Sequence, residues 1–135
     1  MSVTLTVQDK LTLRTAAYGA VTLMAAAGAA GRPHRAATDG SIALYSATGL
    51  VGHVLAEKSK GMDLNGTSVA ALADRVLPAL TAAMTVLKEQ DPAEADNFRR
   101  TVVIAVEAAG RAHQGEPGPV MAETARKITE ALDAA

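Results

Sequence analysis

Two long stretches of this chain carry almost no charge, and they restrict the folds open to it. No side chain from Thr15 to Gly31 is charged, and from Ser41 to Ala56 only His53 can become charged. A helix that is apolar or small on every side is normally buried on every side. One such helix can form the centre of a small domain, but two are hard to enclose with only three others. The sequence therefore predicts that a second copy of the chain covers one of them. The alternative is that the Ser, Thr, Gly and Ala residues of these helices are simply exposed to solvent.

The hydrophobic spacing predicts an all-α fold, an antiparallel bundle of about five helices that forms a single domain over residues 1–135. Alanine, the best helix former, is abundant, and aromatic residues, which favour strands, are scarce. Thr6 and Asp91 are expected to cap helices, with Glu94 bonding back to Asp91 as its capping-box partner. Pro78 is expected to kink the helix that contains it. We expect the helices to lie at approximately 6–30, 38–60, 66–90, 92–112 and 118–134.

The composition excludes several classes of function. The absence of cysteine excludes thiolate zinc sites and disulfide scaffolds and fits a cytoplasmic protein. A net charge of -1, with two Tyr, one Phe and no Trp, argues against binding nucleic acid. The uncharged stretch before Gly31 falls short of about 20 strongly apolar residues, so no membrane span is expected. Asp9 and the Ala- and Gly-rich composition disfavour a signal peptide, and that composition is typical of a bacterial source.

Small residues in the uncharged stretches point to a homodimer interface through the first or second helix. They recur at spacings of three and four residues, which places them on one helix face and allows two backbones to approach closely. Tight packing of the two helices inside one chain is the alternative explanation. The candidate interface residues are Gly19, Leu23, Gly49, Gly52 and Ala56.

Two candidate sites involve charged groups. His53 and Glu57 are four residues apart and share a helix face, so together they form half of a metal site, and a metal-dependent enzyme is one alternative function. The basic loop near residues 31–41 runs into a helix N-terminus, where free backbone N–H groups favour anions. A phosphate or carboxylate ligand would there meet Arg32, His34, Arg35 and Ser41.

A third candidate site is a small-molecule pocket between helices near the expected kink at Pro78, because bundle interiors often hold ligands. It would be lined by Leu77, Met84, Phe98 and Val102. No nucleophile constellation and no cofactor motif is found, so neither catalytic residues nor a cofactor are expected. The leading hypothesis is a non-enzymatic, self-associating helical protein, and a small-molecule or anion-binding protein is the alternative.

Overall fold

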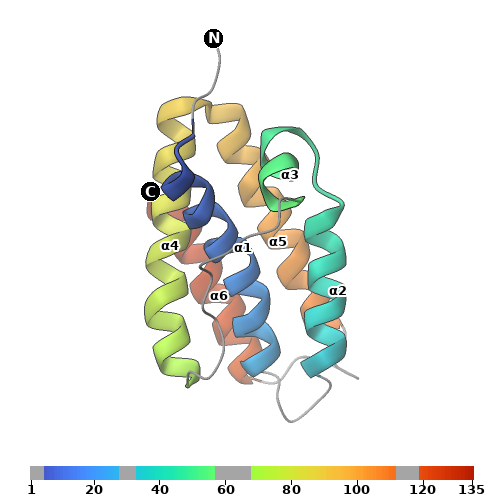
Figure 1. Ribbon diagram of the computed structural model, residues 1–135. Helices are drawn as coiled ribbons and strands as arrows, with labels where there is room; N and C mark the ends of the chain where they lie inside the picture. The colour runs from blue at the N-terminus through green and yellow to red at the C-terminus, as the bar shows by residue number, and fades with distance from the viewer. Residues whose placement is uncertain (1–4, 28–32, 57–67, 112–118) are drawn as a thin grey trace.

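A computed structural model describes residues 5–27, 33–56, 68–111 and 119–135, with the backbone alone for residues 33–37. The described part of the chain is an all-α bundle, as the sequence predicts, and holds six helices rather than five (Figure 1). These are α1 (Val7–Ala27), α2 (Pro33–Tyr45), α3 (Gly49–Ala56), α4 (Val69–Gln90), α5 (Pro92–Arg111) and α6 (Pro119–Asp133).

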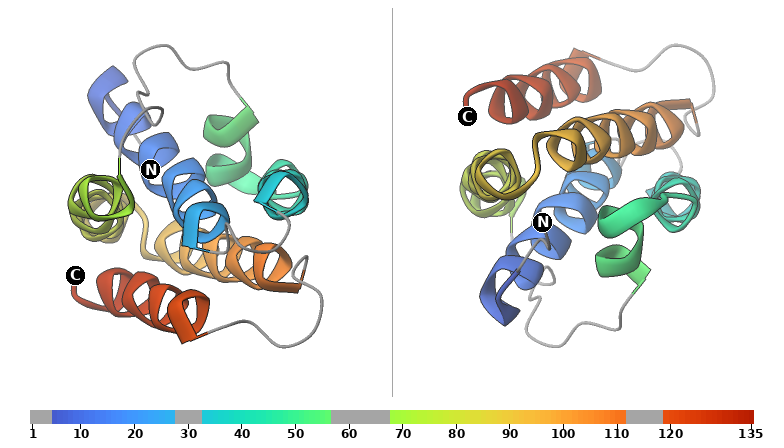
Figure 2. Two further views of the ribbon diagram at one scale, coloured as in Figure 1. Left: turned by 90° about the horizontal axis from the view of Figure 1, so that it is seen from below. Right: turned by 90° about the horizontal axis from the view of Figure 1, so that it is seen from above.

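Helix α1 lies at the centre of the bundle. It runs obliquely between α4 and α2, and α5 and α6 lie together on one side of it (Figure 2). Every residue from Asp9 to Ala27 is buried or half-buried by other parts of the same chain. Its amino-terminal turn is closed by two reciprocal hydrogen bonds, because the Asp9 N–H donates to Thr6 Oγ1 over 2.9 Å and the Thr6 N–H donates to Asp9 Oδ2 over 3.1 Å. The first uncharged stretch is therefore the core helix of its own chain.

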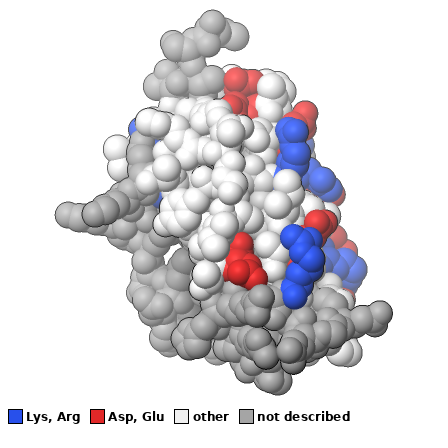
Figure 3. Space-filling view, turned by 90° about the vertical axis from the view of Figure 1, so that its right-hand side faces the viewer, with Lys and Arg blue, Asp and Glu red and all other residues white. Residues whose placement is uncertain are grey.

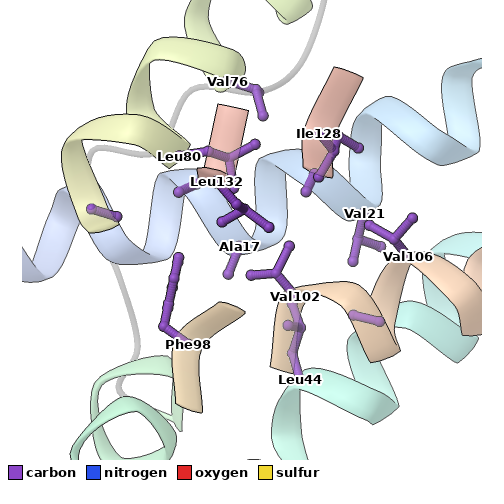
Figure 4. Close-up of a cluster of buried hydrophobic side chains, with 14 of the residues drawn as sticks. Ala17, Val21, Leu44, Val76, Leu80, Phe98, Val102, Val106, Ile128 and Leu132 are labelled. Carbon is purple, nitrogen blue, oxygen red and sulfur yellow. The ribbon is translucent and has the colours of Figure 1, made fainter. Parts of the chain in front are cut away.

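The hydrophobic core joins side chains from all six helices, including Val51, Val54 and Leu55 of α3, and Figure 4 shows part of it. Phe98 is its largest member and is fully buried. Small alanine side chains on α1 let the neighbouring helices approach it closely. Larger apolar side chains from those helices fill the space between the backbones. The members labelled in Figure 4 come from α1, α2, α4, α5 and α6 and are Ala17, Val21, Leu44, Val76, Leu80, Phe98, Val102, Val106, Ile128 and Leu132.

The helix predicted over 38–60 is in fact two helices, and this boundary prediction was wrong. Helix α2 begins at Pro33, where a proline at the first helical position needs no N–H partner, and it ends at Tyr45. After a three-residue turn, α3 begins at Gly49, whose φ of 72° lies in the left-handed region that favours glycine. The expected end near residue 60 lies outside the described residues.

The other boundaries are closer to expectation. Helix α4 begins at Val69 rather than 66, because the hydroxyl of Ser68 accepts the Ala71 N–H over 3.1 Å and forms the N-cap. It continues through Pro78 to Gln90. Asp91 caps α5 as predicted, since its carboxylate accepts the Ala93 N–H over 3.1 Å.

An ion pair ties α5 to the end of α6. The guanidinium of Arg99 donates to both carboxylate oxygens of Asp133, over 2.7 and 3.1 Å. This hydrogen-bonded guanidinium lowers the pKa of the Asp133 carboxyl from its usual 3.8. Because both side chains are about half exposed, solvent screening keeps the contribution below about 1 kcal/mol.

This pair gives a pH-dependent prediction. A lowered folded-state pKa means that the stabilisation is present above pH 3.8 and is lost as the pH falls through the folded value. We expect Asp133→Asn to lower the melting temperature by a few degrees at about pH 7, and the difference to shrink towards about pH 3. Circular dichroism melts of both proteins measure it. An equal difference at both pH values would contradict this role of the ion pair.

Candidate functional site

A broad surface with few charged side chains lies over α2 and the neighbouring side of α5. Two hollows, of about 350 and about 440 Å³, follow the line between these helices and share Ala43. We call this line, with the residues that line the two hollows, the α2–α5 groove. Its walls are Asp39, Ile42, Ala43, Ser46, Ala47 and Thr48 from α2 and the turn after it, with Asn97, Arg100, Thr101, Ile104, Ala108 and Arg111 from α5.

Large apolar side chains stand out from this surface. Ile42 is 58% exposed, Tyr45 is 65% exposed, and Ile104 across the groove is 47% exposed. Figure 3 looks onto this side of the molecule and shows a broad uncharged area, with most of the charged side chains along its right-hand edge. The second uncharged stretch of the sequence is thus covered by its own chain on one side only.

Charged side chains form an exposed row along α5 at the edge of this surface. Asp96, Arg100, Glu107 and Arg111 are separated by four, seven and four residues, which places them on one face of the helix with Ile104 between them. Glu107 and Arg111 form an ion pair with 4.0 Å between their nearest atoms. Arg100 makes no ion pair or hydrogen bond with any residue of the described segments.

Contacts from α5 hold the turn between α2 and α3 and so shape one end of the groove. The Leu50 N–H donates to Glu94 Oε1 over 2.8 Å, and the Asn97 side-chain amide donates to the carbonyl of Thr48 over 2.8 Å. Glu94 therefore caps the start of α3 instead of bonding back to Asp91, whose own N–H donates to Leu87. The capping-box prediction was wrong because the carboxylate reaches a donor 44 residues earlier in the chain.

Two side chains of α1 hold the other end of α3. Arg14, buried although charged, donates to the carbonyl of Val54 over 3.4 Å, and the Tyr18 hydroxyl donates to the carbonyl of Leu55 over 2.8 Å. Burial and a hydrogen bond with Tyr45 raise the pKa of the Tyr18 hydroxyl, which keeps it a neutral donor. The ring of Tyr45 lies against that of Tyr18, with 6.1 Å between centroids, so its exposed position is fixed.

The structure separates the residues predicted to form an oligomer interface. Gly19 and Leu23 are buried in the core, and a Cβ built on Gly19 would lie 2.6 Å from a methyl group of Val76 on α4. These two small or apolar positions serve packing within the chain. Gly49, Gly52 and Ala56 lie on α3, where Gly52 approaches the backbone of Ala47 closely.

The predicted metal and anion sites are described only in part. His53 is exposed on α3, and Glu57 lies outside the described residues. Within the described segments no three His, Asp or Glu side chains come together as a candidate metal site. Ser41 is half-buried on α2, while Arg32 and the side chains of His34 and Arg35 lie outside the described part of the chain.

The pocket predicted near Pro78 differs from the hollow that lies there. Met84, Phe98 and Val102 are at most 3% exposed and belong to the core, while Leu77 is half-buried. The hollow beside Pro78, of about 340 Å³, opens to solvent between α1 and α4. It is lined by Gln8, Leu11, Thr12, Thr15, Arg75, Pro78, Ala79 and Ala82.

Among the described residues, one helix, α4, is long and apolar enough to cross a membrane by length and composition. Core helices of soluble proteins pass the same test, and α4 packs against α1, α5 and α6 in this chain.

Comparison with protein-family models, with curated proteins and with solved structures finds no match to this chain.

Proposed function

We propose that this protein is a non-enzymatic, self-associating helical protein of the bacterial cytoplasm, in which two copies pair through the α2–α5 groove. One observation carries the proposal. Both uncharged stretches are expected to be buried. The chain buries or half-buries the uncharged part of α1 from Thr15 to Ala27, but it leaves Ile42 and Tyr45 of α2 more than half exposed.

A single exposed isoleucine needs no explanation, because most folded proteins expose scattered apolar side chains. Here Ile42, Tyr45 and Ile104 project around small uncharged residues, on a surface that a second chain can approach closely. Contiguous apolar surfaces with a polar rim are typical of protein–protein contacts. A homodimer is the simplest assembly, since two-fold pairs are the commonest oligomers of soluble proteins.

The variant Ile42→Asp tests the proposal. A carboxylate at the centre of the interface would lose its hydration on pairing, so we expect the dimer dissociation constant to rise at least about tenfold. Sedimentation velocity over a dilution series measures this change. Ile42 is exposed, so the fold should survive, which circular dichroism checks.

A matched control keeps the experiment specific. Val120→Asp introduces the same charge at a position of similar exposure, 60% against 58%, but on α6. We expect it to leave the dissociation constant unchanged. Equal association of wild type and both variants would contradict the proposed surface.

A further inference from the structure

We propose further that the two copies pair with their α5 helices antiparallel, so that Arg100 of each copy faces Glu107 of the other. This inference rests on the proposed self-association and adds the orientation and the charged contacts that select it. The two-fold axis would pass between Val103 and Ile104, at the middle of the exposed row on α5.

The order of charges along α5 carries the inference. The row reads acidic at Asp96, basic at Arg100, acidic at Glu107 and basic at Arg111. Arg100 lies three residues before Val103 and Glu107 three residues after Ile104, while Asp96 and Arg111 lie seven residues away on the same two sides. Turning the helix end for end about this midpoint therefore exchanges every basic position with an acidic one.

A two-fold axis across the helix performs this exchange, because in such an interface residue i contacts residue j and j contacts i. Two copies would then form two Arg100–Glu107 pairs and two Asp96–Arg111 pairs around a central contact of Ile104 with its counterpart. A parallel pairing of the same faces would instead set Arg100 against Arg100 and Glu107 against Glu107. Such like-charge contacts disfavour association, so the charges select the antiparallel arrangement.

The state of these side chains in the single chain agrees with this arrangement. All four charged residues and Ile104 are exposed. Arg100 has no ion-pair partner among the described residues, and the 4.0 Å contact between Glu107 and Arg111 leaves both side chains more than 60% exposed. Arg100, Glu107 and Arg111 can therefore each form an ion pair with a second copy of the chain.

Helix α2 fits beside this row. Ala43 lines the same hollow as Ile104, and Ile42 lines the neighbouring hollow with Ala108 and Arg111, so the last turn of α2 lies beside the α5 row. The same two-fold axis would bring Ile42 and Ala43 close to their counterparts. The uncharged surface and the row of charges then belong to one continuous interface.

Charge reversal with complementation tests the orientation. Arg100→Glu alone and Glu107→Arg alone each place two like-charge pairs in the dimer, so each should raise the dissociation constant about tenfold or more. The double variant Arg100→Glu with Glu107→Arg restores both pairs and should return to the wild-type value. An equal mixture of the two single variants should form a heterodimer, because each then meets an opposite charge. Glu89→Arg on α4 is the control and should leave association unchanged.

The outcomes separate the two proposals. A wild-type chain that stays monomeric at every concentration overturns the self-association, and this inference with it. A wild-type dimer that ignores both single reversals overturns the antiparallel arrangement alone. The antiparallel arrangement is also overturned if the single variants weaken the dimer but neither the double variant nor the mixture restores it. Rescue by both, measured by sedimentation velocity or native mass spectrometry, supports the arrangement.

Discussion

Replacing Phe98 by alanine is expected to lower the free energy of unfolding by about 3–5 kcal/mol. Phe98 is fully buried and is the only phenylalanine in the chain, in a core otherwise built from alanine, valine, leucine, isoleucine and methionine side chains. Alanine would leave a large cavity beside side chains of several helices, which can close around it only in part. Chemical denaturation followed by circular dichroism measures the change.

The size of the cavity can be graded with a second variant. Phe98→Leu removes less volume and keeps an apolar side chain, so its loss should be well below that of Phe98→Ala. A loss below about 1 kcal/mol for the alanine variant would contradict the position of Phe98 at the centre of the core.

Replacing Gly40 by valine is expected to have the second largest effect, a loss of about 2–3 kcal/mol. A Cβ built on Gly40 would lie 2.7 and 2.9 Å from the two terminal methyl groups of Val21 and 3.3 Å from the carbonyl oxygen of Ala105. Val21 is buried on α1 and, as a β-branched residue in a helix, has one strongly preferred rotamer, so it cannot move aside easily. The gain in helix propensity over glycine, below about 1 kcal/mol, is too small to offset the clash.

A double variant identifies the cause. If the methyl groups of Val21 are the obstacle, Val21→Ala combined with Gly40→Val should cost less than the sum of the two single changes. Additive losses in denaturant titrations would show that α2 does not approach α1 as closely as described. This approach matters for function because it sets α2 against both α1 and α5, where the groove forms.

Much of the fold follows from local sequence. The apolar spacing of α4, α5 and α6, the caps at Thr6 and Asp91, and the burial of the uncharged α1 all depend on residues close in the chain. The break between α2 and α3 does not. It depends on Glu94 and Asn97, which contact Leu50 and Thr48 from more than 40 residues away. No local pattern around Ser46 to Thr48 reports such a partner.

The candidate surface was predictable in part. The missing charge from Ser41 onward includes the last turn of α2, where the structure leaves Ile42 and Tyr45 exposed. The small residues were a poorer guide, because Gly19 serves close packing against Val76 inside the chain. The contribution of Ile104 and the charged row on α5 needs the structure, since only the fold places α5 beside α2. The alternating charges at 96, 100, 107 and 111 were a readable signal within the sequence.

The mass of the unaltered chain in solution tests the central claim most directly. Sedimentation equilibrium over a wide range of concentrations should show a species of twice 13.8 kDa that dissociates on dilution, and more readily as salt screens the Arg100–Glu107 pairs. A mass of 13.8 kDa at every concentration would contradict the claim that a second copy covers the uncharged face of α2.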